Sequence, residues 1–334
     1  MIELIEAAKE GLTLIYGPPG AGKTSIALRI ADRLANRILW VSTTEGPKYL
    51  GAAAKRVGAN PEKFAFLDFP RAFREDILRY VTEHVNEYDL LVVDSVNGLS
   101  AAVPSLEKAV HSVLYQISHD KPVILVSEEE PLKLHYIADN VVHVWYKKNS
   151  IGHIIRYVQL EKSRRMPPSP RYIFEILDGK IAYLYFSSGM HTGRFVELEE
   201  LGIKVPAKSV ICITSSKTTK VLELLNRIKN EALFLKLGPW EAYTGLELKE
   251  GQEYQAKTFH DLFKLLDLIA SRKITTKYLV VSGLLNLKDR EVLDYVFYIS
   301  ACLNYVDYVA ISEIGAPDET KRIQKFCTEN IFVD

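Results

Sequence analysis

Residues 17–24 read Gly-Pro-Pro-Gly-Ala-Gly-Lys-Thr and match the phosphate-binding pattern G-x-x-x-x-G-K-[ST] at every specified position. Before this phosphate loop the apolar run Leu12–Tyr16 predicts a buried strand, and after it Ser25–Leu34 predicts a helix. A strand, a glycine-rich loop and a helix in this order are the context that phosphate binding requires. The stretch therefore predicts an α/β fold organised around a nucleotide site.

The residue types in the phosphate loop each have a chemical reason. The glycines let the backbone curl, so that its N–H groups and the helix N-terminus surround the phosphates. Lys23 adds a positive charge for the β- and γ-phosphate oxygens, and Thr24 can bring its hydroxyl to a Mg²⁺ ion. The predicted nucleotide-binding residues are Gly17, Pro18, Pro19, Gly20, Ala21, Gly22, Lys23, Thr24 and Ser25.

Two carboxylates follow predicted strands of the same sheet. Leu90–Val93 predict a strand that ends in Asp94, and a carboxylate there can hold Mg²⁺ through water. Ile38–Ser42 predict another strand, which leads into Glu45. Because the carboxyl ends of parallel strands line the ligand crevice, Glu45 can face the γ-phosphate and activate water. On local pattern alone, a helix-capping role for Glu45 is equally favoured.

Length and composition limit the class of protein. At 334 residues the chain exceeds one typical domain, and 48% hydrophobic with 25% charged residues are ordinary for globular proteins. Lys plus Arg and Asp plus Glu are 42 each, which argues against nucleic-acid binding mainly by counterion release but leaves a local basic patch open. No apolar run approaches the about 18 residues of a membrane span, and residues 1–6 do not resemble a secretory signal. We expect a cytoplasmic protein.

The cysteines Cys212, Cys302 and Cys327 are scattered and lack C-x-x-C spacing. This pattern favours neither a disulfide framework nor a zinc site. We expect all of them to be small buried residues.

Alternating apolar residues after position 140 predict strands that extend the sheet in antiparallel fashion. Between two of these strands lies a proline-rich turn, 162–168, whose basic residues are Lys162, Arg164 and Arg165. Three interpretations remain open for this basic tip. It is a solvated hairpin end, an anion contact, or a finger that reaches the nucleotide of a neighbouring subunit.

The motifs occur in a specific order: GPPGAGKTS at 17–25, ILWVSTTEG at 38–46, LLVVDSVNGL at 90–99 and LEKSRRMPPSPRYIFEILDGKI at 160–181. This series resembles the RecA-type ATPases, most closely the archaeal RadB and KaiC-like group, over about residues 10–186. Its most distinctive parts are the LEK-x-R-x-x-P hairpin and the TEG that follows the second predicted strand.

The resemblance implies ATP as the nucleotide, with Lys23 and Thr24 as ligands of nucleotide and Mg²⁺ and Asp94 as the second Mg²⁺ carboxylate. It further implies Glu45 as the catalytic glutamate.

The resemblance also implies that Lys162 and Arg164 are the pair of residues that points across a subunit boundary at the ATP of the adjacent subunit. Thr44 stands where KaiC-like proteins often have a second acid, so we expect slow hydrolysis. The segment 128–137 is short, acidic and free of glycine where recombinases have a long DNA-binding loop, so we expect no strand exchange.

The second half repeats the alternation of strands and helices from about residue 207 onward. Residues 88–99 (YDLLVVDSVNGL) match 276–287 (TKYLVVSGLLNL), from which we infer a degenerate second RecA-like domain. SSKTTK at 215–220 replaces the phosphate loop and Ser282 replaces Asp94, so this copy is not expected to bind Mg·ATP. The predicted domains are 1–187 and 188–334. The alternative is an unrelated α/β domain that obeys the same parallel-sheet rules.

The leading functional hypothesis is a slow Mg²⁺-dependent ATPase in which Glu45 orients water. The second is an ATP-operated switch or scaffold with little turnover, whose second half recruits another protein or another copy of the chain. The third, which rests on the resemblance alone, is an accessory factor in DNA repair or recombination, although the net charge does not support DNA binding.

Overall fold

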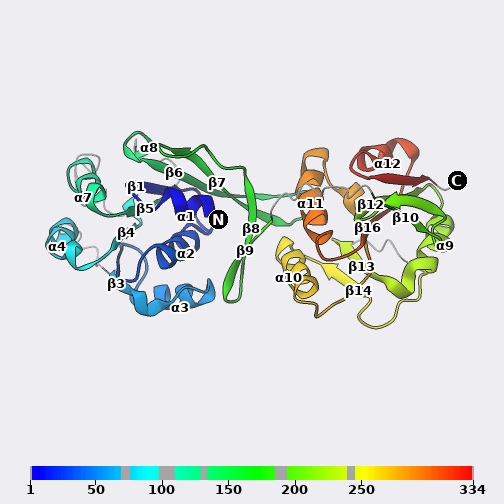
Figure 1. The fold of residues 1–334 in the computed structure, drawn as a ribbon, viewed down its shortest axis with the longest axis horizontal. Helices are drawn as coiled ribbons and strands as arrows, with labels where there is room; N and C mark the ends of the chain where they lie inside the picture. The colour runs from blue at the N-terminus through cyan, green and yellow to red at the C-terminus, as the bar shows by residue number, and fades with distance from the viewer. Residues whose placement is uncertain are drawn as a thin grey trace. The chain divides into compact units, whose positions relative to one another are not determined.

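The computed structural model describes residues 2–68, 76–97, 110–128, 134–184, 194–238 and 245–332. Contacts between residues divide the chain into two compact units (Figure 1). The first unit consists of Met1–Lys147 and Arg156–Tyr183, and the second of Lys148–Ile155 and Leu184–Asp334. Each unit has an α/β fold with its own central sheet.

The first unit contains a nine-stranded sheet among its described residues, in the order β3-β2-β4-β5-β1-β6-β7-β8-β9 (Figure 1). In this order, the neighbouring strands from β3 at one edge as far as β6, which include β1 and β2, pair in parallel, and β7 pairs with β8 in antiparallel fashion. The prediction of an α/β fold with a mostly parallel sheet is confirmed. The strands are β1 (Leu12–Tyr16), β2 (Ile38–Ser42), β3 (Phe64–Asp68), β4 (Leu90–Asp94), β5 (Val123–Ser127), β6 (Asn140–Lys148), β7 (Ile154–Ser163), β8 (Tyr172–Leu177) and β9 (Lys180–Leu184).

The sheet of the first unit is buried on both faces. Leu14 packs in one apolar core and its neighbour Ile15 in another, because successive side chains of a strand point to opposite faces. Ile26 of α2 shares the core of Ile15, and Ile77 of α4 shares the core of Leu14. Burial on both faces explains why these strands read as continuous apolar runs. The described helices are α1 (Ile2–Ala7), α2 (Lys23–Leu34), α3 (Pro47–Arg56), α4 (Asp76–His84), α7 (Tyr115–Asp120) and α8 (Leu134–Ile137).

The second unit contains a six-stranded parallel sheet among its described residues, in the order β14-β13-β15-β16-β12-β17. If the parallel strands of each unit are numbered from one to six in chain order, both sheets have the spatial order 3-2-4-5-1-6. The strands are β12 (Ser209–Ser215), β13 (Ala232–Leu237), β14 (Glu253–Ala256), β15 (Tyr278–Ser282), β16 (Tyr308–Ile314) and β17 (Glu329–Phe332). The helices are α9 (Thr218–Ile228), α10 (Phe259–Ala270), α11 (Asp289–Cys302) and α12 (Pro317–Gln324), and β10 (Phe195–Leu198) pairs with β11 (Ile203–Pro206) in a separate hairpin.

The connections after the first strand of the two sheets differ in length. Six residues, Gly17–Gly22, connect β1 to α2, whereas Ser216 and Lys217 alone connect β12 to α9. A loop of two residues is too short to surround a triphosphate with backbone N–H groups in the manner of the longer loop.

The second unit also includes the turn Lys148–Ile155 between β6 and β7. The side-chain amide of Asn149 donates to the Tyr295 hydroxyl at 2.8 Å, and that hydroxyl lies 2.7 Å from Nδ1 of the buried His153. The Ser150 N–H donates to Glu291 on α11 at 3.1 Å. These contacts join residues about 140 positions apart, which local sequence patterns do not reveal.

Every helix in the described ranges is too short or too polar to cross a membrane.

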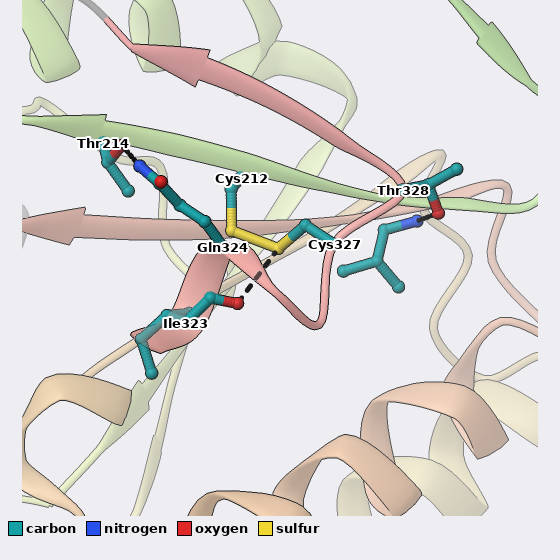
Figure 2. The surroundings of a disulfide bond; sticks show 7 residues. Cys212, Thr214, Ile323, Gln324, Cys327 and Thr328 are labelled. Carbon is teal, nitrogen blue, oxygen red and sulfur yellow. Dashed lines mark hydrogen bonds between the residues drawn. A yellow bond between two sulfur atoms is a disulfide. The ribbon is translucent and has the colours of Figure 1, made fainter. Parts of the chain in front are cut away.

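The cysteines correct one expectation from the sequence. Cys212 and Cys327 form a disulfide (Figure 2), whereas Cys302 is buried and free as expected. The two bonded cysteines are 115 residues apart in sequence, so their spacing carries no local signal. They meet because β17 pairs with β12, which places the turn before β17 beside the middle of β12.

Reduction of this disulfide is expected to lower the free energy of unfolding of the second unit by about 2–4 kcal/mol, because the bond restricts the unfolded chain. Denaturant unfolding with and without a dithiol reductant measures the difference. Alkylation of the denatured, unreduced protein should modify Cys302 alone. Modification of all three cysteines without reductant contradicts the disulfide.

Candidate nucleotide-binding site

The phosphate loop packs tightly against its own sheet, and its glycines make this possible. Gly17 has φ +146°, and a Cβ atom there would lie 1.7 Å from the Val144 carbonyl oxygen on β6. Gly22 has φ +103° and is the N-cap of α2, where no side chain caps the helix. A Cβ at Gly22 would approach the Phe174 ring on β8 to 3.3 Å. A side chain at Gly17 would therefore require β6 to move, whereas at Gly22 the Phe174 ring would have to shift and the positive φ would add strain.

Lys23, Thr24 and Asp94 meet at the beginning of α2. The Lys23 ammonium donates to the Pro18 carbonyl at 3.0 Å, which folds its side chain back over the loop. The Thr24 hydroxyl donates to Oδ2 of Asp94 at 3.0 Å. Asp94 lies at the end of β4 and is 4% exposed. The structure thus brings together the two residues that the sequence predicts as Mg²⁺ ligands.

The environment of Asp94 fits a cation. The pKa of Asp94 is raised to about 6, mainly by burial and in smaller part by the Glu45 carboxylate, while the hydrogen bond from Thr24 and the charge of Lys23 oppose this rise. A buried carboxylate of this kind gains stability when a cation is placed beside it. Hydroxyl and carboxylate oxygens are ligands that Mg²⁺ accepts, and in the described residues no group of three or more His, Cys, Asp or Glu side chains could hold a metal. Phosphate oxygens and water would therefore complete the coordination.

Glu45 follows β2 and lies in the same cavity as the loop. Its Oε2 atom is buried and has no hydrogen-bond partner among the described residues. Burial raises the pKa of Glu45, and the charge of Arg56 partly offsets this rise. The N-cap of α3 is Gly46, and no side chain caps that helix, so the helix-capping interpretation of Glu45 is wrong. The carboxylate faces the ligand space instead.

The cavity has a volume of about 370 Å³. One wall consists of the loop and of Glu45, and another consists of Tyr49, Ala53 and Arg56 on one face of α3. The remaining lining residues, Arg156, Glu175 and Ile176, come from β7 and β8.

Arg156 and Glu175 form an ion pair in the cavity wall. One terminal nitrogen of Arg156 donates to both oxygens of Glu175, at 2.8 and 3.0 Å. Sequence reasoning missed this pair and also Arg56. The i, i+4, i+7 spacing of Tyr49, Ala53 and Arg56 was a detectable signal of a shared helix face. The position of Arg156 had no such signal, since it depends on the pairing of β7 with β8.

The basic tip lies away from this cavity. The Lys162 ammonium donates to the carbonyl oxygens of His135 and Ala138, at 2.7 and 2.8 Å. Nε of Arg164 lies 3.1 Å from a carboxylate oxygen of Asp139. Within the described part of the chain, these two cations therefore interact with residues at the end of α8. Their action on a neighbouring nucleotide stays a prediction.

Comparisons with known proteins find one matching family and several relatives. The family described as an AAA domain matches residues 11–120. The DNA repair protein RadA of Aquifex aeolicus (strain VF5) is 29% identical over 170 residues, which cover 45% of this chain and 37% of that protein. The DNA repair protein RadA of Campylobacter jejuni subsp. jejuni serotype O:2 is 36% identical over 92 residues, or 26% of this chain and 20% of that protein. The DNA repair and recombination protein RadB of Methanosphaera stadtmanae is 23% identical over 198 residues, or 50% of this chain and 85% of that protein.

The chain thus spans less than half the length of the two RadA proteins that it matches. The matches support a RecA-like P-loop ATPase.

Proposed function

We propose that the first unit binds ATP with Mg²⁺ and hydrolyses it slowly. The observation that carries the proposal is the buried Oε2 atom of Glu45, which has no hydrogen-bond partner among the described residues and lies in the cavity that the phosphate loop lines. A buried carboxylate with a raised pKa, in the cavity that the phosphate loop lines, is suited to orient water and accept its proton. The Lys23 ammonium, which lines the same cavity, would neutralise phosphate charge.

Thr24 and Asp94 would hold the Mg²⁺ ion. When bound, Mg²⁺ neutralises charge on the phosphate oxygens. Thr44 beside Glu45 is exposed and carries no carboxylate, which supports slow turnover because a single acid remains to act on water.

The second unit is proposed to be a RecA-like copy without a nucleotide site. Its strand order equals that of β1 to β6, which supports a common origin. Besides the shortened loop, Ser282 stands at the end of β15, where the first unit has Asp94. Glu313 of β16 accepts hydrogen bonds from the N–H groups of Gly283 and Leu284, at 2.8 and 2.6 Å, so a side chain of the protein occupies this strand end.

An ATP-operated switch and a DNA repair accessory factor remain second and third proposals. The switch is supported by the second unit, which keeps the α/β fold without the phosphate loop, and it predicts that nucleotide is retained with no measurable turnover. The role in DNA repair is supported only by the names of the RadA and RadB relatives. Absence of a gel shift with DNA at low salt, with and without ATP, would remove it. An association with another copy of the chain or another protein is likewise a proposal.

Glu45→Gln is expected to lower ATP turnover roughly 100-fold, because the amide cannot accept a proton from water. The affinity for Mg·ATP should change little, since the shape of the side chain is kept. Phosphate release measures turnover, and calorimetry measures affinity.

Glu62→Gln is the matched control, because Glu62 is exposed and does not line the cavity. Equal background rates in wild type, Glu45→Gln and Lys23→Ala would refute the ATPase proposal.

A further inference from the structure

We propose that Arg56 supplies, from within the same chain, the cation that stabilises charge on the γ-phosphate during hydrolysis. One chain is then sufficient for turnover. This inference rests on the proposed ATPase function of the first unit, and it names a further residue that touches the transferred group.

Hydrolysis creates a need for positive charge beyond the loop. The transition state of phosphoryl transfer spreads charge over the γ-phosphate oxygens, and nucleotide-hydrolysing enzymes meet it with an arginine from the same chain or from a partner. Lys23 lies on the side of the loop, held near Pro18. A second protein cation that acts beside Mg²⁺ is expected near Glu45, the residue proposed to orient water.

Arg56 lies on that side. Tyr49, Ala53 and Arg56 are spaced i, i+4, i+7 on α3, so they share the face that lines the cavity with Glu45. Ala53 is small, so no bulky side chain separates the guanidinium from the centre of the cavity on this face. The guanidinium is exposed, and in the described part of the chain it makes no hydrogen bond or ion pair. Its recruitment by a phosphate would break no existing bond.

An electrostatic observation agrees with this placement. The charge of Arg56 lowers the pKa of Glu45 against the effect of burial, which means that the guanidinium acts across the cavity on the residue expected beside the γ-phosphate. The other charged residues that line the cavity are Lys23, Arg156 and Glu175.

Arg156 of the cavity wall and the cations of the basic tip are engaged with other groups. Arg156 lines the cavity, but its bonds to both oxygens of Glu175 neutralise its charge. Lys162 donates to two carbonyl oxygens, Arg164 pairs with Asp139, and Arg165 pairs with Glu10. Each would have to break these contacts before it could reach any phosphate. Arg56 would have no such contact to break.

A simpler role for Arg56 is stabilisation of the last turn of α3, where cations favour the helix dipole. Lys55 is in the same turn, is exposed and does not line the cavity. Lys55→Ala therefore removes a dipole-stabilising cation without touching the site, and it is the matched control.

Arg56→Ala is expected to lower turnover at least 100-fold while the Kd for Mg·ATP changes less than about fivefold. Arg56→Lys should recover part of the rate, because it restores charge without the fork of donors. Lys55→Ala should keep the wild-type rate. Full activity of Arg56→Ala, beside an active wild type, overturns this inference alone, whereas an inactive wild type overturns the proposed function as well.

Mixing two inactive variants tests the same-chain assignment. A Lys23→Ala chain lacks a working loop but keeps Arg56, and an Arg56→Ala chain has the reverse defect. If Arg56 acts within its own chain, the mixture is no more active than its parts, and turnover per wild-type chain does not depend on protein concentration. Restored activity in this mixture would overturn the assignment. It would also be overturned if Arg164→Ala alone lost turnover and mixing it with the Lys23→Ala chain restored the activity.

Discussion

Lys23→Ala is expected to weaken Mg·ATP binding by roughly 100- to 1,000-fold and to remove measurable turnover. The ammonium of Lys23 donates to the Pro18 carbonyl at 3.0 Å, which keeps it beside the loop that is expected to bind the phosphates. Its loss leaves the triphosphate without its main charge partner on the loop. Calorimetric titration with Mg·ATP measures the affinity, and phosphate release measures the rate.

Lys48→Ala provides the comparison, because Lys48 is exposed on α3 and does not line the cavity. It removes one positive charge from the same unit without removing a ligand. Nucleotide affinity should then remain that of the wild type. A loss of affinity in Lys23→Ala that is no larger than in Lys48→Ala would mean that the loop does not bind the triphosphate.

Gly17→Ala is expected to destabilise the first unit by on the order of 4 kcal/mol, or to prevent its folding. The new Cβ would lie 1.7 Å from the Val144 carbonyl oxygen, a distance that no relaxation of side chains can relieve, since Val144 O belongs to the backbone of β6. The φ of +146° at Gly17 adds strain for any residue with a side chain. Denaturant unfolding followed by circular dichroism measures the effect.

Substitutions at two other glycines distinguish the effect of the steric clash from the effect of the positive φ. Gly20 has φ +76° but no heavy atom within 4 Å of an added Cβ, so Gly20→Ala should cost about 1–2 kcal/mol through strain alone. Gly51 lies inside α3 with open space around it, and Gly51→Ala should stabilise the unit by about 0.5–1 kcal/mol. The expectation fails if Gly17→Ala is no more destabilised than Gly20→Ala.

The loop and the strand ends around it could be predicted because their signals are local. Leu12–Tyr16 and Leu90–Asp94 are strands in the structure as the apolar runs predict, and both are buried on two faces. Parallel strands direct their carboxyl ends to one edge of the sheet, so Thr24 and Asp94 meet although 70 residues separate them. Chain order and strand direction were sufficient for this part of the site.

The disulfide could not be predicted, because it depends on a pairing between distant strands. Cys212 and Cys327 meet only when β17 lies beside β12. The ion pair of Arg156 with Glu175 likewise depends on the register of β7 and β8. Arg56 enters the cavity because α3 turns one face toward the loop, which hydrophobic periodicity alone does not specify for a charged residue.

The sequence by itself therefore determined the mostly parallel α/β fold of the first unit and the meeting of Thr24 with Asp94 at the start of α2, because backbone geometry and residue spacing over short stretches impose both. Only the tertiary structure decided which other side chains share the cavity. Arg56 and Glu45 line the same cavity, and Lys162 donates to carbonyl oxygens at the end of α8. Such contacts follow from the packing of separate elements, which short stretches of sequence do not specify.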